Sequence, residues 1–347
     1  MFRSAWSGGD AEEIADMERM WTDMMKQASM EAGSLGGLEG EPGAPWGAGL
    51  QQQQLQSPLE APYELTKDNP YAASRSAFED GMRLFGEGRL GEATMAFHAV
   101  VEADPAHADA WHMLGIVHQE NDEDKKAILC LERAVENDAY HLDALLALGV
   151  SYVNELDLNL ALRTLKAWIV NNSAFSGLQV KEDAYSDGSL MDEVMNLMLQ
   201  AAKYAPANTD VAEVLGVLYN VSRDYMSAVQ EFKRAIGAKP DSWTLWNRLG
   251  ATYANGHLGP EAVPCYLRAL ELRPAYARAL LNLGISYSNS GDYSAAIKAY
   301  LDALRSSPDA LHVYGYIRIA LTAMNRFDLV PLADRSDLEG LRRAFGV

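Results

Sequence analysis

The 347-residue sequence has little cysteine and no long apolar run. Its two cysteines, Cys130 and Cys265, are too few for a disulfide framework or a zinc site built from several thiolates. We expect two buried free thiols in a reducing compartment. No apolar run approaches the roughly 18 residues that a spanning helix needs, and residues 1–16 lack the apolar core of a secretory signal. The sequence predicts neither a disulfide-stabilised secreted domain nor a membrane span.

Basic residues are also scarce. Lysine and arginine number 29 against 48 aspartates and glutamates, so the formal net charge is −19. Phosphate contacts and anionic membrane surfaces both require a positive protein surface. The balance therefore argues against a nucleic-acid binder and a polybasic membrane anchor, and it leaves cationic partners open.

Motifs of catalysis and metal binding are missing as well. The sequence has no glycine-rich phosphate loop, no His-Glu-x-x-His and no Gly-x-Ser-x-Gly. Its seven histidines are scattered, and His112 and His118 are six residues apart, which is not ligand spacing on a helix. We therefore expect no enzyme, no cofactor and no metal site.

What the sequence does have is a repeat. Six glycines that end apolar turns mark a 34-residue period, interrupted once by a gap of 67 residues: Gly81, Gly115, Gly149, Gly216, Gly250 and Gly284. Alanine, an aromatic residue and proline recur at fixed offsets after most of them. A 34-residue period is that of the tetratricopeptide repeat (TPR), in which small residues let two antiparallel helices approach and large residues fill the space between them. The predicted fold is an all-α TPR superhelical solenoid with three repeats, a broken repeat, three repeats and a helical cap.

The repeat register divides the chain into five parts. Residues 33–62 are rich in glycine, proline and glutamine, so we expect a linker there. The predicted parts are an acidic, partly disordered segment at 1–70 with a short helix near 12–30, repeats 1–3 at 71–173, a degenerate fourth repeat acting as a hinge at 174–208, repeats 5–7 at 209–308, and a helical cap at 309–347.

The first helix of each repeat lines a concave groove, so function is read from its inward positions. Five asparagines and two arginines fall there: Asn154, Asn247, Asn255, Asn282, Asn289, Arg248 and Arg278. Amides both donate and accept, so they can pair with the backbone of an extended peptide, and two cations among them can hold a carboxylate. The alternative is that they are solvated helix-end and surface residues.

Two further groups flank this polar centre. Val150, Val153 and Ala251 occupy inward positions and predict a small apolar pocket. The N-terminal repeats place acidic residues inward, including Glu120, with Asp122 just beyond it. A solvated acidic face explains these acids equally well. A groove with acids on one side and arginines on the other suits a ligand that has a basic residue just before a free carboxylate.

Three segments carry a more specific resemblance. Residues 245–256, 278–289 and 150–155 resemble the sixth, seventh and third repeats of the peroxisomal targeting signal 1 receptor, the peroxin-5 family. The layout of three repeats, a broken repeat, three repeats and a helical tail also resembles that family. Arg248 departs from it, because lysine is more frequent at this position.

The resemblance implies a receptor for the C-terminal tripeptide of imported proteins, Ser-Lys-Leu and its variants. It implies that the terminal carboxylate and peptide backbone are held by Asn154, Asn247, Arg248, Arg278 and Asn282, with Asn289 assisting near the small residue and Asn255 as a further groove amide. Val150, Val153 and Ala251 would shape the leucine pocket, and Glu120 and Asp122 would favour the basic middle residue. The implied location is the cytoplasm, with shuttling to the peroxisomal or glycosomal membrane and its docking and import proteins.

The N-terminal region matches that family less well. Trp6, Trp21 and Trp46 are not followed four residues later by phenylalanine or tyrosine, and there is no early cysteine. We therefore expect a C-terminal fragment of a longer receptor. Two other functions stay open from the sequence: a co-chaperone that binds an acidic tail, which needs more cations than this groove offers, and an enzyme that uses the repeats as a scaffold.

Overall fold

The computed structural model describes residues 63–66, 68–179 and 188–347. These residues belong to one compact unit, Ser57–Val347. The helix predicted near 12–30 and the linker predicted at 33–62 lie outside the described residues. Within the described ranges all regular structure is helical, which confirms the predicted all-α class.

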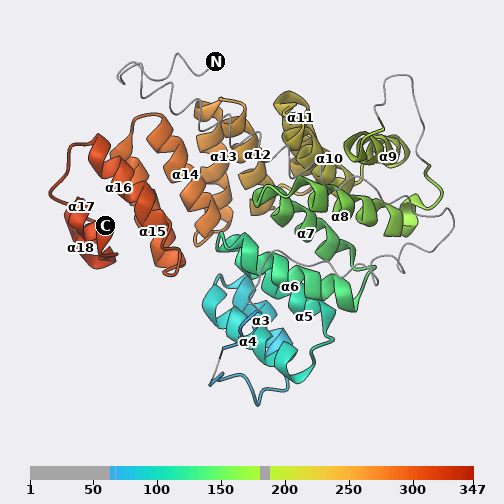
Figure 1. Ribbon diagram of the computed structural model, residues 1–347, viewed down its shortest axis with the longest axis horizontal. Helices are drawn as coiled ribbons and strands as arrows, with labels where there is room; N and C mark the ends of the chain where they lie inside the picture. Colours follow the sequence, from blue (N-terminus) through green and yellow to red (C-terminus); the bar gives the residue numbers. More distant parts are fainter. Residues whose placement is uncertain (1–62, 67, 180–187) are drawn as a thin grey trace, which may run out of the picture. The chain divides into compact units, whose positions relative to one another are not determined.

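The helices follow one another as antiparallel hairpins (Figure 1). Their bounds are α3 Ala77–Gly86, α4 Leu90–Ala103, α5 Ala108–Glu120, α6 Asp124–Asn137, α7 Leu142–Asn154, α8 Leu158–Asn171, the 3₁₀ turn η2 Ser173–Phe175, α9 Leu190–Tyr204, α10 Thr209–Val221, α11 Tyr225–Ala238, α12 Trp243–Asn255, α13 Gly259–Leu272, α14 Ala277–Asn289, α15 Tyr293–Ser306, α16 Val313–Ala323, α17 Val330–Asp334 and α18 Leu338–Phe345.

The repeated glycines lie where the two helices of a hairpin touch. A Cβ atom added to Gly250 would lie 2.7 Å from the ring of Tyr266, and one added to Gly284 would lie 2.4 Å from the ring of Tyr300. Both rings are almost completely buried. The 34-residue pattern is therefore a packing pattern, in which a missing side chain on the first helix makes room for a large one on the second.

The turn inside each hairpin repeats with the same period. One residue in each turn has a positive φ angle, and the interval between these residues is 34 except for a single gap of 67: Gly88, Asp122, Leu156, Arg223, His257, Gly291 and Asn325. Asp157, Asp224 and Asp292 each follow such a residue and cap the second helix by accepting a backbone N–H three positions on. The turns place Asp122 and its neighbours at the open edge of the second repeat.

In the described part of the predicted degenerate repeat, residues 174–179 and 188–208, the one α-helix is α9, which lies between α8 and α10 in the chain. Val194 and Met198 of α9 are fully buried in one apolar cluster with Leu165 of α8 and Leu215 of α10. The core is thus continuous from the third to the fifth repeat at this point. A hinge role for 174–208 stays a prediction.

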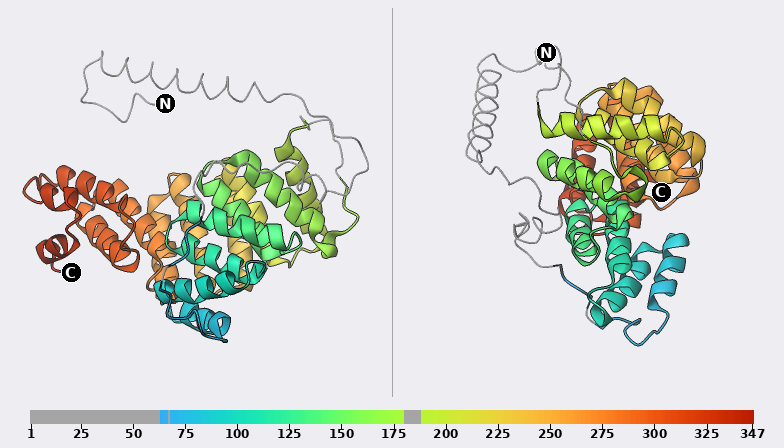
Figure 2. Two further views of the ribbon diagram at one scale, coloured as in Figure 1. Left: turned by 60° about the horizontal axis from the view of Figure 1, so that its bottom comes forward. Right: turned by 90° about the vertical axis from the view of Figure 1, so that its right-hand side faces the viewer.

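The helices α16, α17 and α18 close the C-terminal end of the array. They form the red end of the ribbon in Figure 2. The stretch predicted as a helical cap, 309–347, contains α16 and α18, with α17 between them. Leu341 of α18 is fully buried in a cluster with Ile317 of α16 and Leu304 of α15. Among the described helices, none combines the length and apolarity that a bilayer span requires.

The short segment before α3 is anchored by two buried histidines. The Tyr63 hydroxyl lies 2.7 Å from Nε2 of both His98 on α4 and His118 on α5. Thr66 bonds to Nδ1 of His98 through its backbone N–H and its hydroxyl, and Nδ1 of His118 lies 2.8 Å from Glu123. Burial, together with His118, lowers the pKa of His98 to about 4.

Candidate functional site

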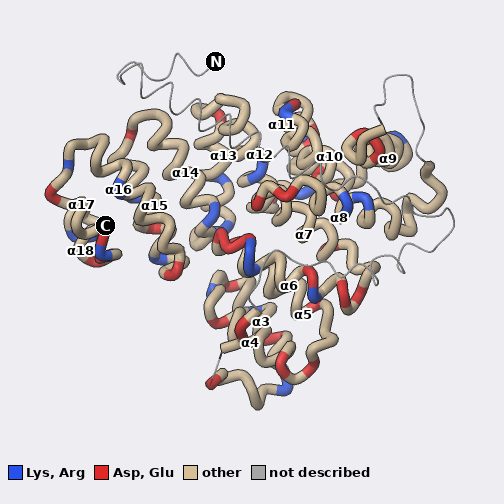
Figure 3. Tube along the Cα trace, viewed as in Figure 1, with Lys and Arg blue, Asp and Glu red and all other residues tan. Residues whose placement is uncertain are grey.

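Acidic and basic residues lie along the Cα trace where the turn between α5 and α6 meets α14 (Figure 3). Asp124, the first residue of α6, is at the centre and its side chain is 6% exposed. It accepts hydrogen bonds from Ser151 Oγ at 2.9 Å, from Asn154 Nδ2 at 3.1 Å on both oxygens, and from Arg278 Nη2 at 2.6 Å. One carboxylate therefore joins α6, α7 and α14.

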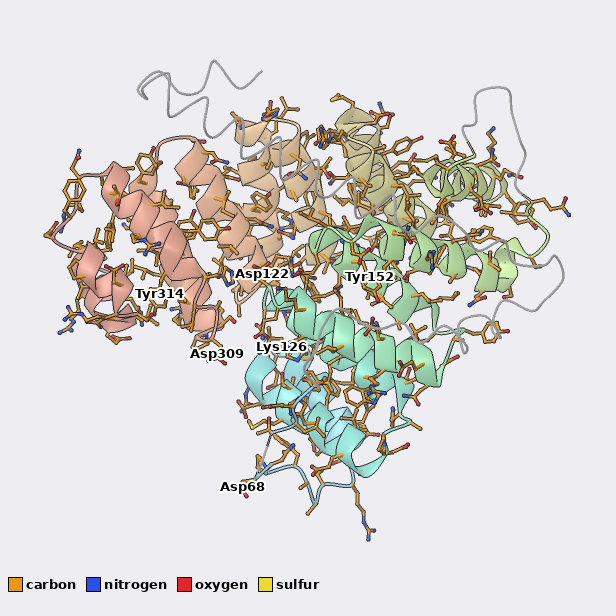
Figure 4. All side chains as sticks on the ribbon, viewed as in Figure 1. Asp68, Asp122, Lys126, Tyr152, Asp309 and Tyr314 are labelled. Carbon is orange, nitrogen blue, oxygen red and sulfur yellow. The ribbon has the colours of Figure 1, made fainter. Side chains whose placement is uncertain are left out.

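Arg278 makes two further contacts with the same turn. Its Nε donates to the backbone oxygen of Gln119 at 2.7 Å, and its Nη1 lies 3.0 Å from Asp122. Figure 4 shows Asp122 between α6 and α14. Burial alone would lower the pKa of Arg278, but Asp124 and Asp122 outweigh it and hold that pKa above its ordinary value. The structure thus brings together three predicted residues, Arg278, Asn154 and Asp122.

The other predicted donors continue the cluster across α12 and α14. Asn282 Nδ2 donates to Asn247 Oδ1 at 3.1 Å, and Asn247 Nδ2 lies 3.5 Å from the Tyr276 hydroxyl. Arg248 is paired with Glu213 of α10. Burial and the nearby Arg278 lower the pKa of Arg248. Two cations and several amides, drawn from three repeats, therefore share one partly buried region.

The remaining predicted residues lie in different surroundings. Asn255 donates to Asn220 at 3.1 Å on an exposed edge, and Asn289 is exposed at the end of α14. Val150 is buried in the apolar cluster that α9 also joins, and Val153 packs against that cluster. Ala251 is half-buried.

Glu120 has a partner other than the predicted one. Its side chain is 2% exposed and accepts from Arg273 Nε and Trp243 Nε1, both at 3.0 Å. The Arg273 guanidinium also lies 4.7 Å from the centre of the Phe85 ring and 5.1 Å from that of Trp243, and it donates to the Gly86 oxygen at 3.3 Å. Burial raises the pKa of Glu120, against the pull of Arg273. We call Glu120, Arg273, Trp243 and Phe85 the clasp; its carboxylate is not available to a ligand's basic residue.

Two residues of the cluster were missed by the sequence reasoning. Asp124 begins a second helix, whereas only first-helix positions were searched for groove residues. Glu213 does occupy a first-helix groove position, five residues into its repeat, so the register contained the signal. Among the described residues, no group of three or more histidine, cysteine, aspartate or glutamate side chains could hold a metal ion.

Comparison with known proteins supports the repeat and the resemblance. Two tetratricopeptide repeat family models match residues 78–141 and 242–309. The chain is 30% identical to a peroxisomal targeting signal receptor of Eremothecium gossypii, over 98% of this chain and 61% of that protein. It is 36% identical to the receptor of that name from Candida albicans, over 65% of this chain and 40% of the relative.

A plant relative gives the same picture. Peroxisome biogenesis protein 5 of Arabidopsis thaliana is 38% identical, over 49% of this chain and 23% of that protein. The chain thus spans between 23% and 61% of the length of these three relatives. These matches confirm the TPR solenoid and the resemblance to the peroxin-5 receptors.

Proposed function

We propose, from the similarity of this chain to the peroxin-5 receptors, that its groove binds the free C-terminal carboxylate and the last residues of cargo proteins that are imported into peroxisomes. The function is reversible binding of a Ser-Lys-Leu-type tail, without catalysis. The location proposed with it is the cytoplasm, with docking at import proteins of the peroxisomal or glycosomal membrane.

One observation carries the proposal. Arg278, Arg248, Asn282, Asn247 and Asn154 come from three repeats and lie in one partly buried, electrostatically connected cluster. Cations and amide donors in a desolvated groove favour a carboxylate and a peptide backbone, because charge-assisted hydrogen bonds are stronger there than in water.

The roles divide by chemistry. The two arginines and the amides of Asn282, Asn247 and Asn154 would hold the carboxylate and the backbone, with Asn255 and Asn289 as outer amides. Ala251, with Val150 and Val153, would form the apolar floor for the last side chain. Asp122 and Asp124 are the acids that pair with Arg278, and they replace Glu120 in the proposed contact with a basic residue.

The test compares a peptide ending in Ser-Lys-Leu with its C-terminal amide by fluorescence anisotropy. The acid is expected to bind at least tenfold more tightly, since a lost charge-assisted hydrogen bond costs roughly 1.5–3 kcal/mol and 1.4 kcal/mol is tenfold. Equal affinity for both peptides contradicts the proposal. A third peptide with an acidic tail separates this function from that of a co-chaperone, which would bind the acidic tail more tightly.

Asn282→Ala is the matching change in the protein. We expect the affinity for the acid peptide to fall about tenfold because a donor to the ligand is lost, and we expect the chain to stay folded although Asn247 loses a hydrogen-bond partner. Asn171→Ala is the control: this amide lies on α8, outside the groove, and donates to the Ala139 oxygen at 2.8 Å. Peptide affinity is expected to be the same in this control as in the unaltered chain.

A further inference from the structure

The donors assigned to the ligand carboxylate are already occupied by the protein's own acceptors. The three guanidinium nitrogens of Arg278 lie against Gln119, Asp122 and Asp124. Arg248 faces Glu213. The carboxylates of Asp122 and Asp124 therefore compete with a ligand carboxylate for Arg278, and Glu213 competes with it for Arg248.

Asp124 resembles a bound ligand carboxylate in its contacts. It receives hydrogen bonds from an arginine, an asparagine amide and a serine hydroxyl, and two of those donors, Arg278 and Asn154, are ones proposed to hold the ligand. Its side chain is almost completely buried. On the basis of the proposed function, we infer that Asp124 is an internal competitor for the ligand carboxylate and that cargo capture is an exchange of ion-pair partners.

The exchange must conserve charge pairing. When Arg278 turns to the ligand, Asp124 and Asp122 lose their cation. A buried carboxylate without a partner is strongly unfavourable, so this step opposes binding of any ligand that brings only a carboxylate. A ligand with a cation next to its carboxylate restores both pairs, since its cation takes the aspartates as its carboxylate takes Arg278.

This mechanism makes the two charges of the ligand interdependent. If the aspartates simply attracted a basic residue, the lysine of the peptide would contribute the same factor to affinity with or without the terminal carboxylate. In a partner exchange, lysine contributes mainly when the carboxylate is present, because only then is Asp124 released. The difference between the two cases is the coupling measured by a double-mutant cycle.

The experiment uses four peptides, ending in Ser-Lys-Leu or Ser-norleucine-Leu, each as the free acid and as the amide. For the unaltered chain, replacing lysine by norleucine is expected to weaken the acid about tenfold and the amide less than about threefold. For Asp124→Asn, the acid norleucine peptide is expected to bind about tenfold more tightly than it does to the unaltered chain, and the lysine preference shrinks.

The control is Glu123→Gln, which makes the same charge change in the same turn. Glu123 pairs with His118 at 2.8 Å and Lys126 at 2.5 Å and does not contact Arg278. Its four affinities are expected to match those of the unaltered chain. Circular dichroism checks that each variant is folded.

Asp122→Asn keeps the inference testable if Asp124→Asn does not fold. It removes one carboxylate from Arg278 and leaves the bonds of Asp124 to Ser151 and Asn154, so the same change in smaller measure is expected. The inference is overturned if the acid norleucine peptide binds the folded Asp124→Asn chain, or the Asp122→Asn chain in its place, no more tightly than it binds the unaltered chain. Asp124 then only positions Arg278 and Asn154. If the unaltered chain does not distinguish acid from amide, it is the proposed function that fails.

Discussion

The N-terminal half of the array, α3 to α8, and the C-terminal half, α10 to α16, contribute opposite charges to their contact. Acids come from the end of α5, the turn after it and the first residue of α6, and basic groups come from the residue after α13, from α14 and from the residue before α16. The pairs described above and one more, His312 Nε2 at 3.4 Å from Asp122, all have this polarity: Glu120–Arg273, Asp122–Arg278, Asp124–Arg278 and Asp122–His312. The two halves therefore attract each other through opposite charges. In the proposed complex the basic residue of the ligand likewise faces the acids of the N-terminal half, and its carboxylate faces the arginines of the C-terminal half.

The clasp and the Arg278 cluster divide this contact into two kinds of ion pair. In the clasp, aromatic rings flank Arg273, and the acid has one other donor, Trp243. In the cluster, Asp124 keeps the hydroxyl of Ser151 and the amide of Asn154 if Arg278 leaves. The first pair is suited to holding the halves together, and the second is suited to exchange.

The largest expected effect comes from breaking the clasp. Arg273→Met leaves Glu120 buried without a cation, and we expect a loss of about 3 to 5 kcal/mol in the free energy of unfolding, measured in urea. Small-angle scattering should show a larger radius of gyration as the halves separate. Peptide affinity should fall with it, although Arg273 does not line the proposed ligand site.

The matched control removes both charges. Glu120→Gln with Arg273→Met leaves no buried ion, so most of the lost stability is expected to return. A double variant as unstable as the single one would show that packing of the Arg273 side chain between Phe85 and Trp243, not charge, holds the halves together.

The next effect distinguishes the halves by pH. His98, in the N-terminal half, has a folded pKa of about 4 against an ordinary value of 6.5. Because the fold holds this ring neutral, the free energy of unfolding is highest above pH 6.5, falls as the pH drops from 6.5 to 4 and levels off below 4. The loss amounts to about 3 kcal/mol for this group.

The measurement is the free energy of unfolding between pH 7 and pH 4, compared with that of His98→Gln, whose profile should be flatter by that amount. The ring resonances of His98 should titrate near pH 4. A His98 that titrates near 6.5 contradicts the lowering of its pKa by burial and by His118.

The smallest effect compares one turn position in the two halves. Leu156 and Gly291 both have positive φ angles, 63° and 81°, at the equivalent place in their repeats. Leu156 is 82% exposed, so Leu156→Gly gives up little packing and relieves a strained backbone; we expect a gain of about 0.5 kcal/mol. Gly291→Ala should lose about 1 kcal/mol in thermal unfolding. If both changes destabilise the fold, a shared turn geometry is contradicted.

The hairpins were predictable from the sequence because the residues that define them lie close together. Gly250 and Tyr266 are sixteen residues apart and lie in contact. The equivalent two residues have the same spacing and contact in every such hairpin, so a spacing rule predicts this contact. The groove donors Asn247, Asn282 and Arg278 followed from the same register.

The partners of those donors were not predictable in this way. Glu120 and Arg273 are 153 residues apart, and their contact depends on how the curvature of six hairpins brings α5 beside α13 and α14. The repeat register predicts which way a side chain faces within its own repeat. It does not predict which residue of the other half of the array lies opposite that side chain. For that reason Glu120 was expected in the groove and lies in the clasp.

The two cysteines have a practical consequence for observing such motions. Both thiols are buried; burial raises the pKa of Cys265 to about 11 and also raises that of Cys130. Thiolates, which react with maleimide and spin-label reagents, are therefore scarce at neutral pH. The sequence holds no other cysteine, so two cysteines introduced at exposed positions such as Tyr140 and Leu311 can be labelled with fluorophores with little labelling of the native thiols. The distance between the halves can then be followed in the native chain while cargo peptide binds.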